Sequence, residues 1–346
     1  TIGATGTAST LAGIPFFSDT TNGSIYTHDV SGTDSTAANN SAYGITALDA
    51  ITTGDRNTAL GYGAGGSMTT GEKNVFVGYN AGLSGSGGSG VRNVGVGNQA
   101  LLSLTDGQRN VGVGFTAGQL ITTGENNIAI GYSAANGFDT ENHNLAIGTD
   151  ALGGSVAGGE YNVAIGNSTL AALTSGDENT VVGYLAGSSI TTGNTNTLIG
   201  EKAGLSLTTG YMNTFIGRRA GVTQNEGNQN TAVGTYAMYE STGQAYYNTT
   251  LGYAAGYNLS TGDNNLFLGT NAGRSTSPAG AVTTANNQLC LGDDNISAFY
   301  CATSTINTSD KRDKADITNF TAGLSFIEQM QPVTYKWDKR SWYSDD

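Results

Sequence analysis

The sequence predicts an all-β protein, a β-solenoid of about fourteen coils of 17 residues each. Three observations carry this prediction. One phrase recurs along most of the chain, each copy holds a short apolar segment of strand composition closed by glycine, and that segment is free of charge on both faces. We expect the solenoid over residues 40–302, a cap or attachment segment over 1–39, and a different segment over 303–346.

The repeat is defined by an asparagine that we call the anchor. Ten of the thirteen intervals between anchors are 17 residues long, two are 18 and one is 19. Glycine lies four positions after every anchor, and alanine lies seven positions after every anchor except at Thr169. The anchors are Asn40, Asn57, Asn74, Asn93, Asn110, Asn127, Asn144, Asn162, Asn179, Asn196, Asn213, Asn230, Asn248 and Asn265.

The residues after each anchor predict a short strand. VFVG follows Asn74, IAIG follows Asn127 and LFLG follows Asn265. These segments are rich in β-branched and aromatic residues and are too short for a helix before glycine interrupts them. The invariant glycine indicates a tight bend or a close approach of two backbones. Stretches such as TTGDRN and TTGENN predict turns between coils.

Both faces of these strands need a covering, because successive strand side chains point to opposite sides. A second strand in each repeat, starting at the alanine, is predicted to close the coil interior with an apolar residue eleven positions after the anchor. The other face is predicted to pack against identical rods in a closed oligomer, since an exposed apolar stripe would aggregate. The eleventh residues are Ile51, Met68, Leu104, Ile121, Phe138, Leu173, Ile190, Leu207 and Leu259.

We expect the anchor asparagines to stack in register along the rod, with their amides bonded to one another or to turn backbone. The expected role is structural rather than ligand-binding. With strands about 4.8 Å apart, fourteen coils would make a rod roughly 65–70 Å long.

Composition excludes several classes of protein. The 346 residues include 53 glycines without the three-residue period of collagen. The net charge of −13 leaves no basic stripe for nucleic acid. No segment resembles a signal peptide or a membrane span, so no membrane insertion is expected.

Metal and cofactor chemistry is not expected either. His28 and His143 are isolated, and no Cys/His spacing accompanies them. His143 directly precedes an anchor and is interpreted as a loop residue. Cys290 and Cys301 are either two small buried side chains or a disulfide, and the sequence leaves both open.

Aromatic residues suggest where a receptor could be contacted. Tyr246 and Tyr247 lie in the irregular segment 240–247, and insertions in a solenoid emerge as loops on one side. A further set recurs one residue after the invariant glycine, where the rings either pack over the corner of each coil or stack on sugars. This set is Tyr62, Tyr79, Phe115, Tyr132, Tyr184 and Tyr253.

The repeat resembles a known family. The pattern Asn-Thr-Ala-Ile-Gly-Tyr-x-Ala-Gly is similar to the left-handed β-roll heads of trimeric autotransporter adhesins and to the repeat shafts of phage tail fibres, over residues 40–273. The resemblance implies a left-handed coil and three chains. The period here is longer than is usual in adhesin heads, which implies a larger connecting loop.

The end of the chain differs from the repeat. Phe320, Leu324, Ile327 and Met330 fall at helical spacing before Pro332, which predicts a short amphipathic helix. It follows a charged loop.

This end also resembles a known domain. The motif SDKRDK at 309–314 and the motif PVTYKW at 332–337 resemble the start of the intramolecular chaperone domain of endosialidases and phage tail fibres. The resemblance implies self-cleavage between Thr308 and Ser309, with Ser309 as nucleophile and Lys314 as the base that activates it. Asp313 replaces an apolar residue of the family and would hold Lys314 charged. The family domain is also longer than the 38 residues present here.

These observations predict a structural fibre protein of a phage virion, extracellular, with a trimeric shaft for host attachment. The expected partners are two further copies of the chain, other tail proteins, and a glycan or protein of the host surface. One alternative is a trimeric adhesin on a bacterial surface. A glycan-degrading tail spike is less favoured, because it needs a fixed pair of carboxylates and the acidic residues are scattered through turns. The only enzymatic activity expected is self-cleavage.

Overall fold

The computed structural model describes residues 7–11, 14–19, 22–27, 36–83, 87–155 and 157–298. The chain separates into two units, Thr1–Ser297 and Ala298–Asp346, and the fold below is that of the first. The predicted helix near residues 320–330 lies outside the described residues, as does the rest of segment 303–346.

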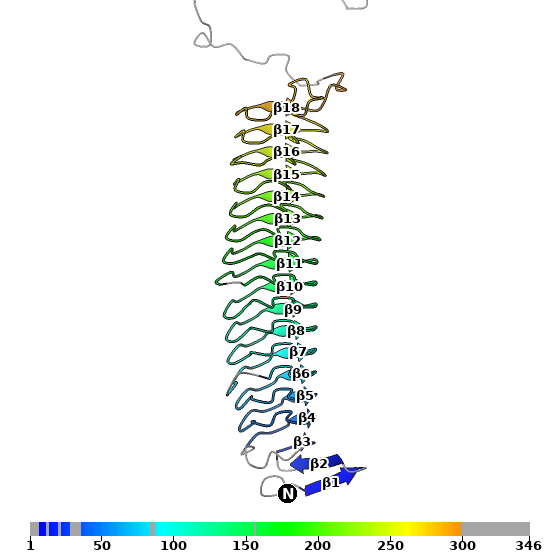
Figure 1. The fold of residues 1–346 in the computed structure, drawn as a ribbon, viewed down its shortest axis with the longest axis vertical. Helices are drawn as coiled ribbons and strands as arrows, with labels where there is room; N and C mark the ends of the chain where they lie inside the picture. Colours follow the sequence, from blue (N-terminus) through cyan, green and yellow to red (C-terminus); the bar gives the residue numbers. More distant parts are fainter. Residues whose placement is uncertain are drawn as a thin grey trace, which may run out of the picture. The chain divides into compact units, whose positions relative to one another are not determined.

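The described residues form one sheet of eighteen strands. β1 (Thr7–Leu11) and β2 (Ile14–Asp19) form an antiparallel hairpin, and β2 pairs antiparallel with β3 (Ser24–Tyr26). From β3 onward every strand pairs in parallel with the next along the chain (Figure 1). This all-β solenoid confirms the predicted fold class.

Fourteen strands of three residues each directly follow the fourteen anchors. β3 and β18 (Leu289–Leu291) add one coil at either end of the predicted repeat. The fourteen are β4 (Ser41–Tyr43), β5 (Thr58–Leu60), β6 (Val75–Val77), β7 (Val94–Val96), β8 (Val111–Val113), β9 (Ile128–Ile130), β10 (Leu145–Ile147), β11 (Val163–Ile165), β12 (Thr180–Val182), β13 (Thr197–Ile199), β14 (Thr214–Ile216), β15 (Thr231–Val233), β16 (Thr249–Leu251) and β17 (Leu266–Leu268).

The middle residue of each repeat strand points into the coil, and its two neighbours point outward. Ala129 is fully buried, whereas Ile128 and Ile130 are each 38% exposed. The same alternation holds along the stack, because the strands pair in register with no slip. The coil interior therefore receives one strand residue per coil, and the first and third residues of each repeat strand lie outside.

The predicted second strand is wrong. Within the described coils, the segment after the alanine forms turns, with one isolated bridge between Met68 and Gly88. A strand requires consecutive extended residues, but the residues six and eight positions after the anchor have left-handed backbone, such as Ser133 (φ 52°) and Ala135 (φ 48°). Hydrogen bonds between coils nevertheless continue through this segment, as from Ala135 N–H to the Ala151 carbonyl (2.9 Å).

The apolar residues eleven positions after the anchor are nonetheless buried, as predicted. All are 4% exposed or less, and they fill the coil from the side opposite the strand: Ile51, Met68, Leu104, Ile121, Phe138, Leu173, Ile190, Leu207 and Leu259.

The core also shows a size match that the repeat alone did not reveal. Where the middle strand residue is large, the residue six positions later is glycine, as in the pairs Phe76 with Gly82 and Phe215 with Gly221. A Cβ at Gly82 would lie 2.3 Å from the Phe76 ring. Opposite the middle glycine Gly95, a large side chain, Leu101, enters from the other position. Leu101 also fills the space beside Gly112 and Gly118 in the next coil.

The invariant glycines combine both features expected of them. Their φ angles lie between +103° and +143°, a region that L side chains rarely adopt. At Gly183, an added Cβ would also lie 2.4 Å from the carbonyl oxygen of Gly200 in the next coil. The backbones of successive coils are thus in contact at this corner.

Replacing Gly183 with alanine is expected to destabilise the solenoid by more than about 3 kcal/mol, because left-handed strain adds to a backbone clash. The measurement is the denaturant midpoint followed by circular dichroism. Gly87→Ala is the matched control, because its φ of +68° is also positive but nothing lies within 4 Å of the added Cβ. Equal losses in the two variants would contradict the close-approach explanation.

Candidate functional site

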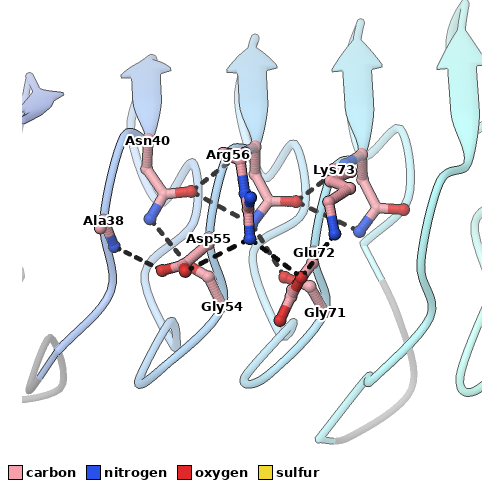
Figure 2. Close-up of polar contacts among 10 residues, drawn as sticks. Ala38, Asn40, Gly54, Asp55, Arg56, Gly71, Glu72 and Lys73 are labelled. Carbon is pink, nitrogen blue, oxygen red and sulfur yellow. Dashed lines mark hydrogen bonds and ion pairs between the residues drawn. The ribbon is translucent and has the colours of Figure 1, made fainter.

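The anchor asparagines form a continuous side-chain ladder through the solenoid. All fourteen are 2% exposed or less. In a typical step, Asn57 N–H and Asn57 Nδ2 donate to Asn40 Oδ1 at 2.9 and 3.1 Å, and Asn57 Nδ2 also donates to the Gly71 carbonyl at 2.8 Å (Figure 2). Each asparagine therefore closes its own coil and joins it to the preceding coil. These bonds satisfy the buried amides, so the ladder is structural.

Different residues occupy the two ends of the ladder. Ser24 Oγ accepts from Asn40 N–H (3.0 Å), and Gln288 N–H donates to Asn265 Oδ1 (2.8 Å). A hydroxyl and a backbone amide thus satisfy the terminal asparagines. The coil of β18 lies within the predicted range 40–302, whereas the coil of β3 lies before it, and neither contains an anchor asparagine.

A second side-chain ladder, which the sequence analysis missed, lies two residues before the anchor. Asp55 Oδ1 accepts from Ala38 N–H (2.7 Å), Asp177 Oδ1 from Glu160 N–H (2.8 Å) and Asp263 Oδ1 from Tyr246 N–H (2.8 Å). The recurrence of Asp or Asn at this position was the available signal. The same acceptor role is filled by Asn142, Asn228 and Asn286.

Charged residues at this corner pair along the rod. Glu72 lies 2.9 Å from Lys73 Nζ and 3.3 Å from Arg56 Nη2 (Figure 2). The hydrogen bond and charge of Lys73 lower the pKa of Glu72. These groups are solvent-exposed, so such pairs contribute little to stability and serve mainly to keep the surface soluble.

The outward face of the strands carries a large apolar side chain in every coil. It is formed by the first and third residues of the fourteen repeat strands and of β18, and by Ile25 in β3. The third residue is always apolar, whereas the first is Ser or Thr in seven of the fourteen, and no described residue covers the face fully. Its most exposed large side chains are Ile25, Tyr43, Leu60, Val75, Ile128, Ile130, Ile199, Leu251, Leu266, Leu289 and Leu291. We call this surface the outer sheet face.

The aromatic residues after the invariant glycine are about half-exposed and partly stacked. Tyr62 and Tyr79 stack with ring centroids 5.5 Å apart, and Phe115 and Tyr132 with centroids 5.3 Å apart. Each stacked pair thus buries part of its ring surface along the rod and leaves about half of each side chain exposed to solvent. Tyr246 and Tyr247 lie instead just before an anchor, and their tilted rings are 6.4 Å apart. Tyr247 is 61% exposed.

The described residues contain no group of three or more His, Cys, Asp or Glu side chains that could hold a metal ion. His143 is an exposed turn residue (φ 59°) that stacks on Tyr161, as expected for a loop position. Cys290 is buried with a free thiol, and burial raises its pKa. Cys301 lies outside the described residues. No helix in the described ranges is long and apolar enough to cross a membrane.

The proposed cleavage residues Ser309 and Lys314 also lie outside the described residues. Residues 309–345 match the family model described as chaperone of endosialidase. The match begins at Ser309, where the motif analysis places the start of the resemblance. Neither a comparison with curated proteins nor one with solved structures gave a match. The matched family indicates a protein of the phage tail-fibre or tail-spike type. The chain thus combines a parallel β-solenoid with a C-terminal segment that matches the chaperone of endosialidase family.

Proposed function

We propose that the chain is the shaft of a trimeric phage fibre, extracellular on the virion, which carries contacts to a host surface and is assembled with help from its C-terminal chaperone segment. The observation that carries this proposal is the outer sheet face. An apolar stripe running over consecutive coils is not stable in water without a partner, because contiguous apolar patches of this kind promote association.

The periodicity of the outer sheet face favours a second copy as that partner. The same two strand positions recur in register from coil to coil, at the spacing of paired strands, about 4.8 Å. A surface that packs against it efficiently must repeat with the same period. Another copy of the solenoid does so, and closed cyclic symmetry then leaves no face open for further growth.

Three chains is the number that the resemblance to adhesin heads and fibre shafts implies. The chaperone match supports a fibre rather than a bacterial surface adhesin. Other tail proteins and a host glycan or protein complete the proposed set of partners. A virion protein of this type extends from the particle and binds the host surface. Catalysis is confined to self-cleavage in the chaperone segment.

The experiment is a measurement of intact mass, first native and then denaturing, on the purified full chain. The expected native mass is that of three chains, and a monomer would contradict the proposal. The denaturing mass shows whether the Thr308–Ser309 bond is cut. Where it is cut, Ser309→Ala should give the uncut mass, because the attacking hydroxyl is removed. The trimer proposal does not depend on that result.

Placing a charge on the outer sheet face should dissociate the trimer. Ile130 is 38% exposed in the single chain, and lysine there would bury an ammonium group at the interface. We expect Ile130→Lys to shift the native mass to the monomer or to insoluble aggregates. Leu120→Lys is the control, because Leu120 is 49% exposed on a turn outside the strands. A trimer that survives in Ile130→Lys would place the interface elsewhere.

A further inference from the structure

A cleft of about 300 Å³ lies on the turn side of the coils that follow β14, β15, β16 and β17. Its walls come from three positions of the coil: the first and the second residue after the invariant glycine, and the residue nine positions after the anchor. We call it the tyrosine–arginine cleft. Its lining side chains are Arg219, Tyr236, Tyr239, Tyr253, Tyr257 and Arg274.

The tyrosines form a contiguous aromatic surface. Tyr239 and Tyr257 stack with centroids 4.8 Å apart, while Tyr236 meets Tyr239 and Tyr253 edge to face at 5.4 and 6.1 Å. The phenolic hydroxyls can donate hydrogen bonds, and burial raises the pKa of Tyr257. The cleft therefore offers flat apolar rings together with phenolic donors, the combination that favours stacking against a sugar ring.

Two arginines of the cleft have no ion-pair partner among the described residues. Arg274 lies over the Tyr257 ring at 4.7 Å and donates one bond to Asn271 Oδ1 (3.1 Å). The Nε of Arg219 is buried and has no hydrogen-bond partner. The neighbouring Arg218, by contrast, is paired with Glu201 at 2.8 Å.

The absence of a partner is informative because the chain is acidic, with 27 Asp and Glu against 14 Lys and Arg. A carboxylate near the cleft is that of Glu240, which accepts a bond from Asn258 Nδ2 (2.8 Å) instead. Buried polar groups of a guanidinium are normally satisfied. Both arginines line the cleft, in coils three steps apart along the stack, so an acidic group supplied from outside would pair with Arg274 at one end of it.

We propose that the tyrosine–arginine cleft binds an anionic sugar residue, whose carboxylate, sulfate or phosphate pairs with Arg274 while its ring lies against the tyrosines. Arginine presents a planar fork that matches such groups with two parallel bonds. The volume lies at the lower end of ligand sites, about 300–1,000 Å³, which suits a small group rather than a long chain. The net charge of −13 opposes a nucleic acid at this surface.

This inference rests on the proposed contact with a host surface. It adds the chemical class of the group that is contacted, an anionic sugar. The cleft lies on the turns, away from the strand positions that form the outer sheet face. The cleft is tested by measuring saccharide binding to each chain, whereas the trimer is tested by measuring the native mass. A trimer without saccharide binding would overturn only the cleft, and a monomer that binds would overturn only the trimer.

The test uses the purified full chain and pairs of probes that differ only in charge: hyaluronan tetrasaccharide with its carboxyl-reduced form, chondroitin sulfate tetrasaccharide with its desulfated form, and a mannose phosphate oligosaccharide with its dephosphorylated form. Binding is followed by saturation-transfer NMR and titration calorimetry. At least one acidic probe should bind, with its neutral counterpart about tenfold weaker or more. No binding by any acidic probe at millimolar concentration, or equal binding of both members of each pair, would overturn the proposal.

Two variants locate the binding. Arg274→Gln should weaken the acidic probe about tenfold or more while leaving the neutral probe unchanged. Arg109→Gln, which removes the same charge from an exposed pair with Glu125, should bind as the parent does. Tyr257→Ala should lose both probes of the pair, whereas Tyr79→Ala, on the column after the invariant glycine, should not. Equal losses in Arg109→Gln or Tyr79→Ala would show non-specific attraction and overturn the site.

Discussion

Replacing Asn179 with alanine is expected to destabilise the solenoid by about 3–6 kcal/mol. Asn179 Oδ1 accepts from Asn196 N–H and Nδ2 at 3.1 and 3.0 Å, and its Nδ2 donates to Asn162 Oδ1 (3.0 Å) and the Gly193 carbonyl (2.9 Å). Alanine removes all four bonds and leaves their partners buried. An unsatisfied buried group costs about 1–3 kcal/mol.

The position of Asn179 in the array gives this variant a second signature. Each coil of a solenoid contacts only its neighbours, so a weak central coil should divide one unfolding transition into two. Hydrogen exchange measured by mass spectrometry should rise most between residues 162 and 213. Asn194→Ala is the control, because Asn194 is exposed in the same coil. If both variants unfold as the parent does, the ladder is not a major source of stability.

The second large effect concerns the size match in the core. Phe215 is fully buried, and Phe215→Ala should cost about 3–5 kcal/mol through the cavity that it leaves. Gly221→Leu should also destabilise, since even a Cβ there would lie 2.5 Å from the Phe215 ring. The double variant Phe215→Ala/Gly221→Leu should recover much of both losses, because the new leucine fills the cavity.

The chain itself provides the precedent for this double variant. Ala164 and Leu170 occupy the same two positions in another coil, and Leu170 has a φ of 51°, close to the 57° of Gly221. A double-mutant cycle from denaturant melts gives the coupling between the two sites. Losses that simply add would mean that the two positions are filled independently.

The repeat determined much of the fold because its signals are local. An asparagine, three strand residues and a glycine specify a ladder position, a strand and a corner, and fourteen copies remove the ambiguity of any single one. The residue eleven positions after the anchor was correctly placed inside the coil. The inward side of the strand was not resolved, since both Ala129 and its larger neighbours Ile128 and Ile130 are apolar.

The second strand was wrongly predicted because the backbone there adopts a conformation that its residues do not usually prefer. Ala135 and Leu170 adopt left-handed backbone that such residues rarely populate, so a strand was predicted where the chain turns. Stacked hydrogen bonds between coils hold these residues in place. The tyrosine–arginine cleft was missed for another reason. Tyr239, Tyr257 and Arg274 lie nine positions after their anchors. Tyrosine or arginine occurs at this position only in the last coils, so the repeat pattern does not reveal the cleft.

The hydrogen bonds between the asparagines of the ladder all run in one direction along the chain, which relates them to the order of synthesis. Each side-chain oxygen accepts from the following coil, as Asn40 Oδ1 does from Asn57, so a finished coil presents acceptors to the coil that is synthesised next. A ribosome delivers the chain in that same order, and nearest-neighbour contacts allow each coil to form as it emerges. Residues 309–345 are made after the solenoid, when the outer sheet face is complete. In the proposed trimer, the order of synthesis would thus separate coil formation from chain association.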